Sequence, residues 1–106
     1  MARRRGTDRS GNNFTAQTIL AVWNKGQIVA GVDPSVRRKD TCGAWIDYAQ
    51  YGQTVENGRG WEVDHIQQVS HGGSDALSNL QPLQWENNRH KSDNWPNWSC
   101  LKIASN

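Results

Sequence analysis

The chain has 106 residues, a length that fits one small domain. Its formal net charge of +2 is modest for a protein that binds nucleic acid. Its mean hydropathy of −0.86 and the lack of a long apolar run exclude a membrane-spanning helix, and the first residues lack the apolar segment of a secretory signal. We therefore expect a cytoplasmic protein in which Cys42 and Cys100 are reduced thiols, with a bridge between them as the alternative.

Basic charge gathers at the N-terminus, where four arginines accompany one acid: Arg3, Arg4, Arg5, Arg9 and Asp8. Residues 1–13 lack apolar periodicity, so we expect a disordered tail ahead of a folded domain over residues 14–106. Such a tail would add phosphate contacts that carry no sequence information. A tail that serves only solubility is the alternative.

A short packing helix is predicted between Phe14 and Gly26. Thr15 can cap its start, and Gly26 can end it. One face of this helix carries apolar residues at helical spacing, namely Ile19, Val22 and Trp23.

The charged run Arg37-Arg38-Lys39 has two interpretations. One is a solvated surface, and the other is a phosphate clamp beside an active cleft. Arg38 is the preferred phosphate contact, with Arg37 beside it, because a guanidinium can bind phosphate through two hydrogen bonds. Residues 44–48 are rich in strand-favouring types, and residues 53–60 read as a connecting turn.

An acid and an imidazole then follow each other at Asp64 and His65. Hydrolysis of a phosphodiester needs a base that takes a proton from water and a cation that neutralises phosphate charge. His65 suits the first task, and Asp64 suits the second because hard divalent cations take oxygen ligands. Since neighbouring side chains on a strand point to opposite faces, the strand must end or bulge here, and a loop containing Gly72-Gly73 provides the break.

Downstream, residues 80–83 are predicted to be extended and residues 84–93 to form a helix. Gln84, Asn88 and Lys91 fall on one face of this helix. On that face, Asn88 can offer an oxygen to the same metal and Lys91 a cation to a phosphate. Arg89 lies on a neighbouring stripe and is a further candidate for phosphate contact.

The segment over residues 60–93 resembles the HNH endonuclease superfamily, whose core is two antiparallel strands, a helix and one divalent metal. The resemblance implies an α+β fold, here a small single domain with a ββα-metal core and an added N-terminal helix. It also implies that His65 is the general base, that Asp64 and Asn88 hold the metal, and that Asn79 pins the loop carrying the base. Glu62 is then expected to be a structural hydrogen-bond acceptor, because the superfamily works with one metal.

Two departures from the family pattern matter. The third position is Asn88, as in HNN variants, and His90 would lie on roughly the opposite side of the helix. Gln84 and Asn87 stand where many members carry a second cysteine pair, so no four-cysteine zinc site can form. We expect the tryptophans to build most of the core instead: Trp23, Trp45, Trp61, Trp85, Trp95 and Trp98.

The sequence thus predicts a metal-dependent endonuclease acting on DNA, with the choice between DNA and RNA left open. Mg²⁺ is the expected cation, with Mn²⁺ and Ni²⁺ as alternatives. A membrane partner and a small-molecule cofactor are not expected, the oligomeric state is open, and a bacterial or phage origin is suspected. Two alternatives remain, a non-catalytic DNA-binding module of the same fold and a nuclease toxin domain.

Overall fold

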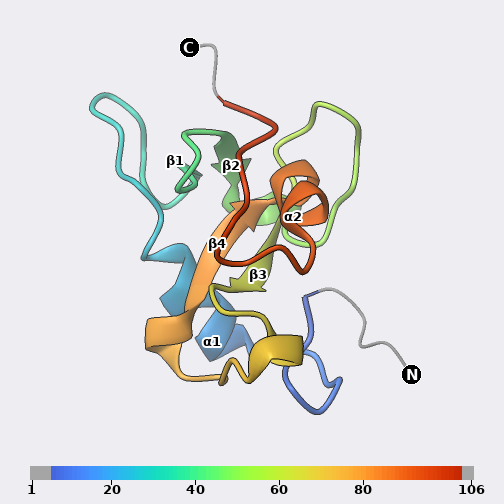
Figure 1. Cartoon of the computed structure of the whole chain (residues 1–106). Coiled ribbons are helices and arrows are strands. Elements are labelled where there is room, and N and C mark those ends of the chain that lie inside the picture. The colour runs from blue at the N-terminus through green and yellow to red at the C-terminus, as the bar shows by residue number, and fades with distance from the viewer. Residues whose placement is uncertain (1–5, 104–106) are drawn as a thin grey trace.

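Short helices and strands follow one another along residues 6–103, which are the residues that the computed structural model describes (Figure 1). The elements are α1 (Ala16–Trp23), β1 (Arg37–Lys39), β2 (Trp45–Asp47), β3 (Trp61–His65), β4 (Leu80–Gln84) and α2 (Trp85–Lys91), with 3₁₀ turns η1 (Tyr48–Gln50), η2 (Val69–His71) and η3 (Leu77–Asn79). The strands form two antiparallel pairs, β1 with β2 and β3 with β4. This mixed α+β architecture confirms the predicted fold class.

The β3–β4 pair and helix α2 form one continuous unit. The strands pair from Trp61 opposite Gln84 to His65 opposite Leu80. Gln84 ends β4 and caps α2, because its side-chain oxygen accepts hydrogen bonds from the amides of Glu86 and Asn87. Helix α2 therefore begins at a fixed point, and it packs against both strands (Figure 1).

Helix α1 covers the same hairpin from another side. Thr15 caps it as predicted, since its hydroxyl accepts from the Thr18 amide at 3.1 Å. Val22 and Trp23 are buried, and Ile19 packs against the core cluster that contains them. The helix ends at Trp23 with Asn24 as its cap, earlier than the predicted end at Gly26.

The tryptophans contribute less of the core than predicted. Trp23 and Trp61 are fully buried and meet at 5.3 Å between ring centroids, whereas the other four are only partly buried. Aliphatic side chains complete the core cluster: Val22, Ile46, Val63 and Leu80. The expectation that tryptophans form most of the core was therefore wrong, because four of the six residues in the core cluster are aliphatic.

The N-terminal residues that the structure describes are folded. Thr7 is buried and pairs with Asn13 as an isolated β-bridge. Asp8 closes the turn between them by accepting from the amides of Ser10 and Asn12. This corrects the predicted disorder for residues 6–13, while Arg3, Arg4 and Arg5 lie outside the described residues.

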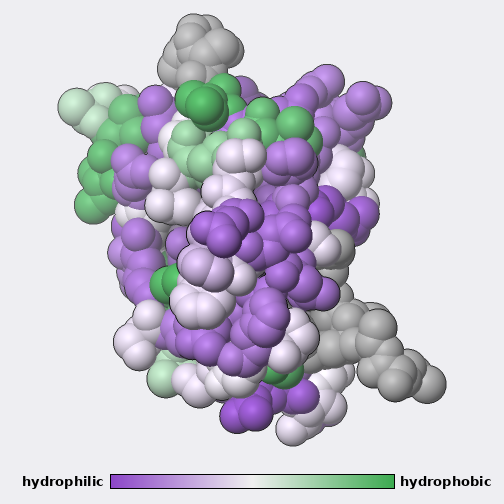
Figure 2. All heavy atoms as spheres, viewed as in Figure 1, coloured by the Kyte–Doolittle hydropathy of each residue, from purple (hydrophilic) through white to green (hydrophobic). Residues whose placement is uncertain are grey.

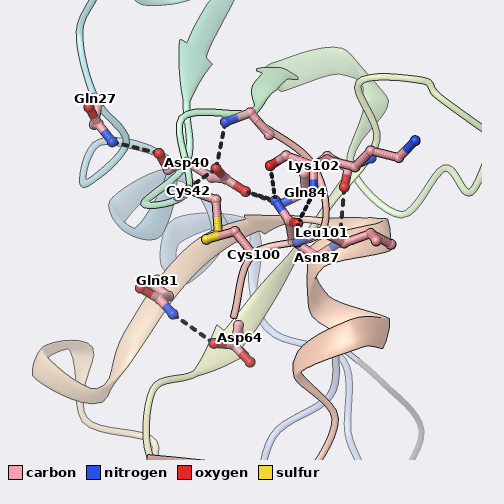
Figure 3. Close-up of a disulfide and its surroundings, with 11 residues drawn as sticks. Gln27, Asp40, Cys42, Asp64, Gln81, Gln84, Asn87, Cys100, Leu101 and Lys102 are labelled. Atoms are coloured by element: carbon pink, nitrogen blue, oxygen red, sulfur yellow. Dashed lines mark hydrogen bonds between the residues drawn. A yellow bond between two sulfur atoms is a disulfide. The ribbon is translucent and has the colours of Figure 1, made fainter. Parts of the chain in front are cut away.

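A buried clamp joins the β1–β2 turn, the start of α2 and the C-terminal segment (Figure 3). Asp40 accepts four hydrogen bonds, from the amides of Cys42, Ala44 and Gln84 and from the Asn87 side chain. Asn87 in turn binds the backbone of residues 101–102. Burial raises the pKa of Asp40, and the four hydrogen bonds oppose that effect.

A disulfide between Cys42 and Cys100 closes the same clamp. The expectation of reduced thiols was therefore wrong, and the bridge kept as the alternative is the one that forms. The sequence could not decide this because 58 positions separate the two cysteines. Their approach depends on how Asn87 holds the C-terminal segment beside the β1–β2 turn.

The surface over α2 is mainly hydrophilic, with hydrophobic residues gathered toward the loop before β1 and the C-terminal segment (Figure 2). Ile28 and Ile103 are the most exposed apolar side chains of these two regions, at 67% and 71%. None of the helices among residues 6–103 has the length and apolar character needed to cross a membrane.

The disulfide gives the first prediction. The double substitution Cys42→Ser and Cys100→Ser should lower the free energy of unfolding by about 2–4 kcal/mol, because the unfolded chain is no longer constrained. Denaturant unfolding of the oxidised wild type against the double variant measures the loss. A reductant should destabilise the wild type by a similar amount and leave the variant unchanged. Equal stability of oxidised and reduced wild type would contradict the clamp.

Candidate active site

Asp64 and His65 are the last two residues of β3, so the strand ends where the sequence requires it to end. Both side chains are buried, at 7% and 3% exposure. After His65 the chain leaves the sheet, and the Ile66 amide donates to the Asn79 carbonyl at 2.7 Å. The two neighbouring side chains can therefore serve one site.

A small cavity of about 50 Å³ lies at this end of β3. It brings together three residues that the sequence singled out: Asp64, His65 and Asn88. Gly6, Val63, Gln68, Ser92 and Asp93 complete its lining. Three segments that are far apart in the chain thus meet at one place, namely the N-terminal turn, the end of β3 and the end of α2.

The Asp64 carboxylate is held by two partners. Its Oδ1 accepts from Lys91 Nζ at 3.2 Å. Its Oδ2 accepts from Gln81 Nε2 at 2.9 Å (Figure 3). Burial raises the pKa of Asp64, while the Lys91 charge and the Gln81 hydrogen bond oppose this rise. The nearby ammonium therefore balances the charge of a carboxylate that has lost most of its water.

Lys91 does not lie where the sequence predicted. It is 1% exposed, and its ammonium also donates to the His65 carbonyl at 2.9 Å. The Asp64 carboxylate and the His65 carbonyl hold this ammonium inside the fold, so its expected role as a phosphate contact needs correction. The sequence placed Lys91 on the correct helix face but treated that face as open to solvent.

Asn88 also reaches the cavity from α2. Its Nδ2 donates to Glu62 Oε1 at 2.8 Å in a buried hydrogen bond. Glu62 is therefore a hydrogen-bond acceptor, as predicted, and it orients the amide. His90 is exposed while Asn88 is 6% exposed, so the two side chains lie on different sides of the helix.

His65 has a partner that sequence reasoning did not assign. Its Nε2 lies 2.7 Å from Asp75 Oδ1, and Asp75 also accepts from the Arg9 amide. Although partial burial disfavours the charged form, the hydrogen bonds to His65 and Arg9 lower the pKa of Asp75. Asp75 belongs to the Gly-containing loop that the sequence highlighted, but the spacing of ten residues gave no signal for this pairing.

Asn79 holds the loop that follows His65. Its Oδ1 accepts from the Gln67 amide at 2.9 Å, and its Nδ2 donates to the carbonyls of Gln67 and Ser74 at 3.1 and 2.8 Å. Gly73 packs so closely that an added Cβ would lie 1.7 Å from the Gln67 carbonyl oxygen, and Gly72 has a φ of +87°. The two glycines are therefore required for the loop to close on Asn79.

The three arginines expected to bind phosphate have different environments in the structure. Arg37 pairs with Asp47 across the β1–β2 hairpin at 2.6 Å. Arg38 is 8% exposed and donates to three backbone carbonyls, those of Asn24, Gly26 and Pro34. Arg38 is held inside the fold, which corrects its predicted phosphate contact, whereas the contact predicted for Arg37 stays a prediction because its side chain is 36% exposed. Arg89 is exposed and lies over the Trp85 ring at 5.2 Å.

Two side chains at the cavity could coordinate a metal ion. Asp64 and Asn88 offer a carboxylate and an amide at one cavity. No cluster of three or more His, Cys, Asp or Glu side chains suited to a metal occurs among residues 6–103. Two oxygen-bearing residues fit a hard cation that keeps several waters, and they do not fit a tetrahedral zinc site.

Comparison with known proteins gives one match. The family model described as HNH endonuclease matches residues 51–98. This range contains β3, β4, α2 and every residue of the cavity lining except Gly6. No curated protein and no solved structure matches the chain.

The buried pair of Lys91 and Asp64 gives the second prediction. Lys91→Met should lower the free energy of unfolding by about 3–5 kcal/mol, because it leaves the buried carboxylate without its cation. Adding Asp64→Asn should recover much of this loss, since a neutral amide needs no counter-charge. Arg89→Met on the exposed face of α2 is the control and should cost less than about 1 kcal/mol. Denaturant unfolding of the four proteins measures the effects, and a Lys91→Met loss no larger than the control would contradict the pairing.

Proposed function

The chain belongs to the HNH endonuclease family, which indicates a nuclease-type function, and from this premise we propose that it is a metal-dependent endonuclease that hydrolyses DNA. The observation that carries the proposal is the convergence of Asp64, His65 and Asn88 on one cavity. A base and two oxygen ligands at one place are what phosphodiester hydrolysis requires.

In the proposed reaction, His65 takes a proton from a water molecule, and the resulting hydroxide attacks phosphorus. The bond from phosphorus to the 3′-oxygen breaks, and that oxygen leaves and gains a proton from solvent. The products carry a 5′-phosphate and a 3′-hydroxyl. Asp64 and Asn88 would hold the cation, with Mg²⁺ expected and Mn²⁺ or Ni²⁺ as alternatives. When bound, the cation supplies positive charge that stabilises the pentavalent phosphorus and the leaving oxygen.

Asp75 is proposed as the positioning residue for His65. A carboxylate that accepts from Nε2 fixes the imidazole tautomer and leaves Nδ1 as the nitrogen that receives the proton from water. Asp75 does not belong to the cavity lining, so it can hold the ring without occupying the space for substrate. Asn79 supports the same arrangement through its three bonds to the loop.

Substrate contacts are assigned to exposed cations only. Arg89 remains the proposed phosphate contact because its guanidinium is exposed on α2, two residues before Lys91. Lys91 itself is proposed to set the position of the Asp64 carboxylate. A phosphate contact by Arg89 would act through charge and would carry no sequence information.

Cleavage of supercoiled plasmid tests the proposed function. Wild-type protein with Mg²⁺, Mn²⁺ or Ni²⁺ should nick or linearise the plasmid, and EDTA should abolish this. His65→Ala should slow cleavage by about 10²–10⁴-fold, because the general base is lost. His90→Ala is the matched control, since this exposed histidine lies on a different side of α2. DNA binding without cleavage under every metal would instead support a binding module, and full activity of His65→Ala would remove it from the base role.

The positioning role of Asp75 gives a further prediction. Asp75→Asn should lower kcat about 10–100-fold with little change in KM, because an amide can stabilise the wrong imidazole tautomer. Asp75→Glu should restore part of the rate. The ¹⁵N shifts of the His65 ring at alkaline pH should show a proton on Nε2 in the wild type and a mixed population in Asp75→Asn. An unchanged kcat with unchanged ring shifts would contradict the role.

A further inference from the structure

Gln68 is buried and has no hydrogen-bond partner for its side chain. It is 4% exposed, and neither Nε2 nor Oε1 finds a partner within residues 6–103. No other side chain among these residues has a buried nitrogen or oxygen left without a partner. An unsatisfied buried amide opposes folding, and native proteins keep few such groups. An ordered water or a bound ligand would supply the missing partner.

The location of Gln68 indicates the nature of this partner. It lines the cavity that also contains Asp64, His65 and Asn88. Its position is fixed by its backbone, because the Gln68 carbonyl accepts from the amides of His71 and Gly73 at 3.0 Å each. The backbone bonds that close the Gly-containing loop thus hold the unpaired amide at the proposed catalytic cavity.

The chemistry of the amide limits what it can bind. A bare anion could satisfy only Nε2, and a bare cation could satisfy only Oε1. Water molecules can satisfy both atoms, because water donates to Oε1 and accepts from Nε2. A water molecule at Oε1 and a phosphate oxygen at Nε2 satisfy them equally well. The cavity of about 50 Å³ has room for ordered water, which needs about 10–15 Å³.

We propose that Gln68 is a further substrate-binding residue that orients the attacking water at this cavity. Its Oε1 accepts a hydrogen bond from the water that His65 deprotonates, and its Nε2 donates to a non-bridging oxygen of the scissile phosphate. No covalent bond to Gln68 forms or breaks. The inference rests on the proposed endonuclease function and names the residue that aligns its nucleophile with its substrate.

Gln68→Met separates this role from a structural one. Methionine keeps a similar length and removes both polar atoms, so single-turnover plasmid cleavage should slow about 10–100-fold. The melting temperature should stay the same or rise, because an unsatisfied buried amide has been removed. Gln53→Met, at an exposed position in the loop between η1 and β3, is the control and should change neither quantity. A structural glutamine would give the opposite pattern, with a lower melting temperature and normal cleavage.

A binding measurement keeps the test independent of catalysis. In the His65→Ala background, Gln68→Met should weaken binding of an uncleaved duplex several-fold in fluorescence anisotropy with Mg²⁺ present, and Gln53→Met should not. If the wild type cleaves no plasmid but Gln68→Met weakens duplex binding, the endonuclease proposal fails and the phosphate contact stands. Two results would overturn the proposal for Gln68. One is unchanged duplex affinity with an unchanged cleavage rate, and the other is unchanged duplex affinity with a lower melting temperature.

Discussion

The buried carboxylate of Asp40 is the contact on which the rest of the structure depends. Its four hydrogen bonds join the β1–β2 turn to the start of α2. Asn87, one of its partners, also binds the C-terminal segment that the disulfide attaches to the same turn. Because Asn88 and Lys91 lie one residue and one turn further along α2, the clamp sets where they meet Asp64.

A second constraint fixes the other half of the site. The loop after β3 must turn tightly enough for Asn79 to bind both Gln67 and Ser74, and the contact at Gly73 leaves no space for a side chain there. This closure brings Asp75 to His65 and places Gln68 at the cavity. The positions of His65, its partner Asp75 and the unpaired Gln68 amide all depend on one loop of about a dozen residues. A rigid loop of this kind holds catalytic groups in place at little entropic cost when substrate binds.

Local signals in the sequence predicted much of this arrangement. The Thr15 cap, the short extended segment at residues 80–83 and the shared helix face of Asn88 and Lys91 depend on neighbours within one or two turns, and the structure confirms them. Most of the failures concern contacts between distant segments. Arg38 and Lys91 looked like surface cations because their carbonyl and carboxylate partners come from other elements. The disulfide, the Asp40 clamp and the pairing of His65 with Asp75 likewise appear only after the chain has folded.

The proposed endonuclease needs one divalent cation at the end of β3, between Asp64 and Asn88 and beside His65. The most direct measurement is a crystal structure of the His65→Ala variant with Mn²⁺ and uncleaved duplex, in which anomalous scattering locates the metal. We expect one anomalous peak within about 2.0–2.3 Å of oxygen atoms from both Asp64 and Asn88, with a phosphate oxygen and waters completing its coordination. A peak bound by other residues, or bound duplex with no peak at this cavity, would contradict it.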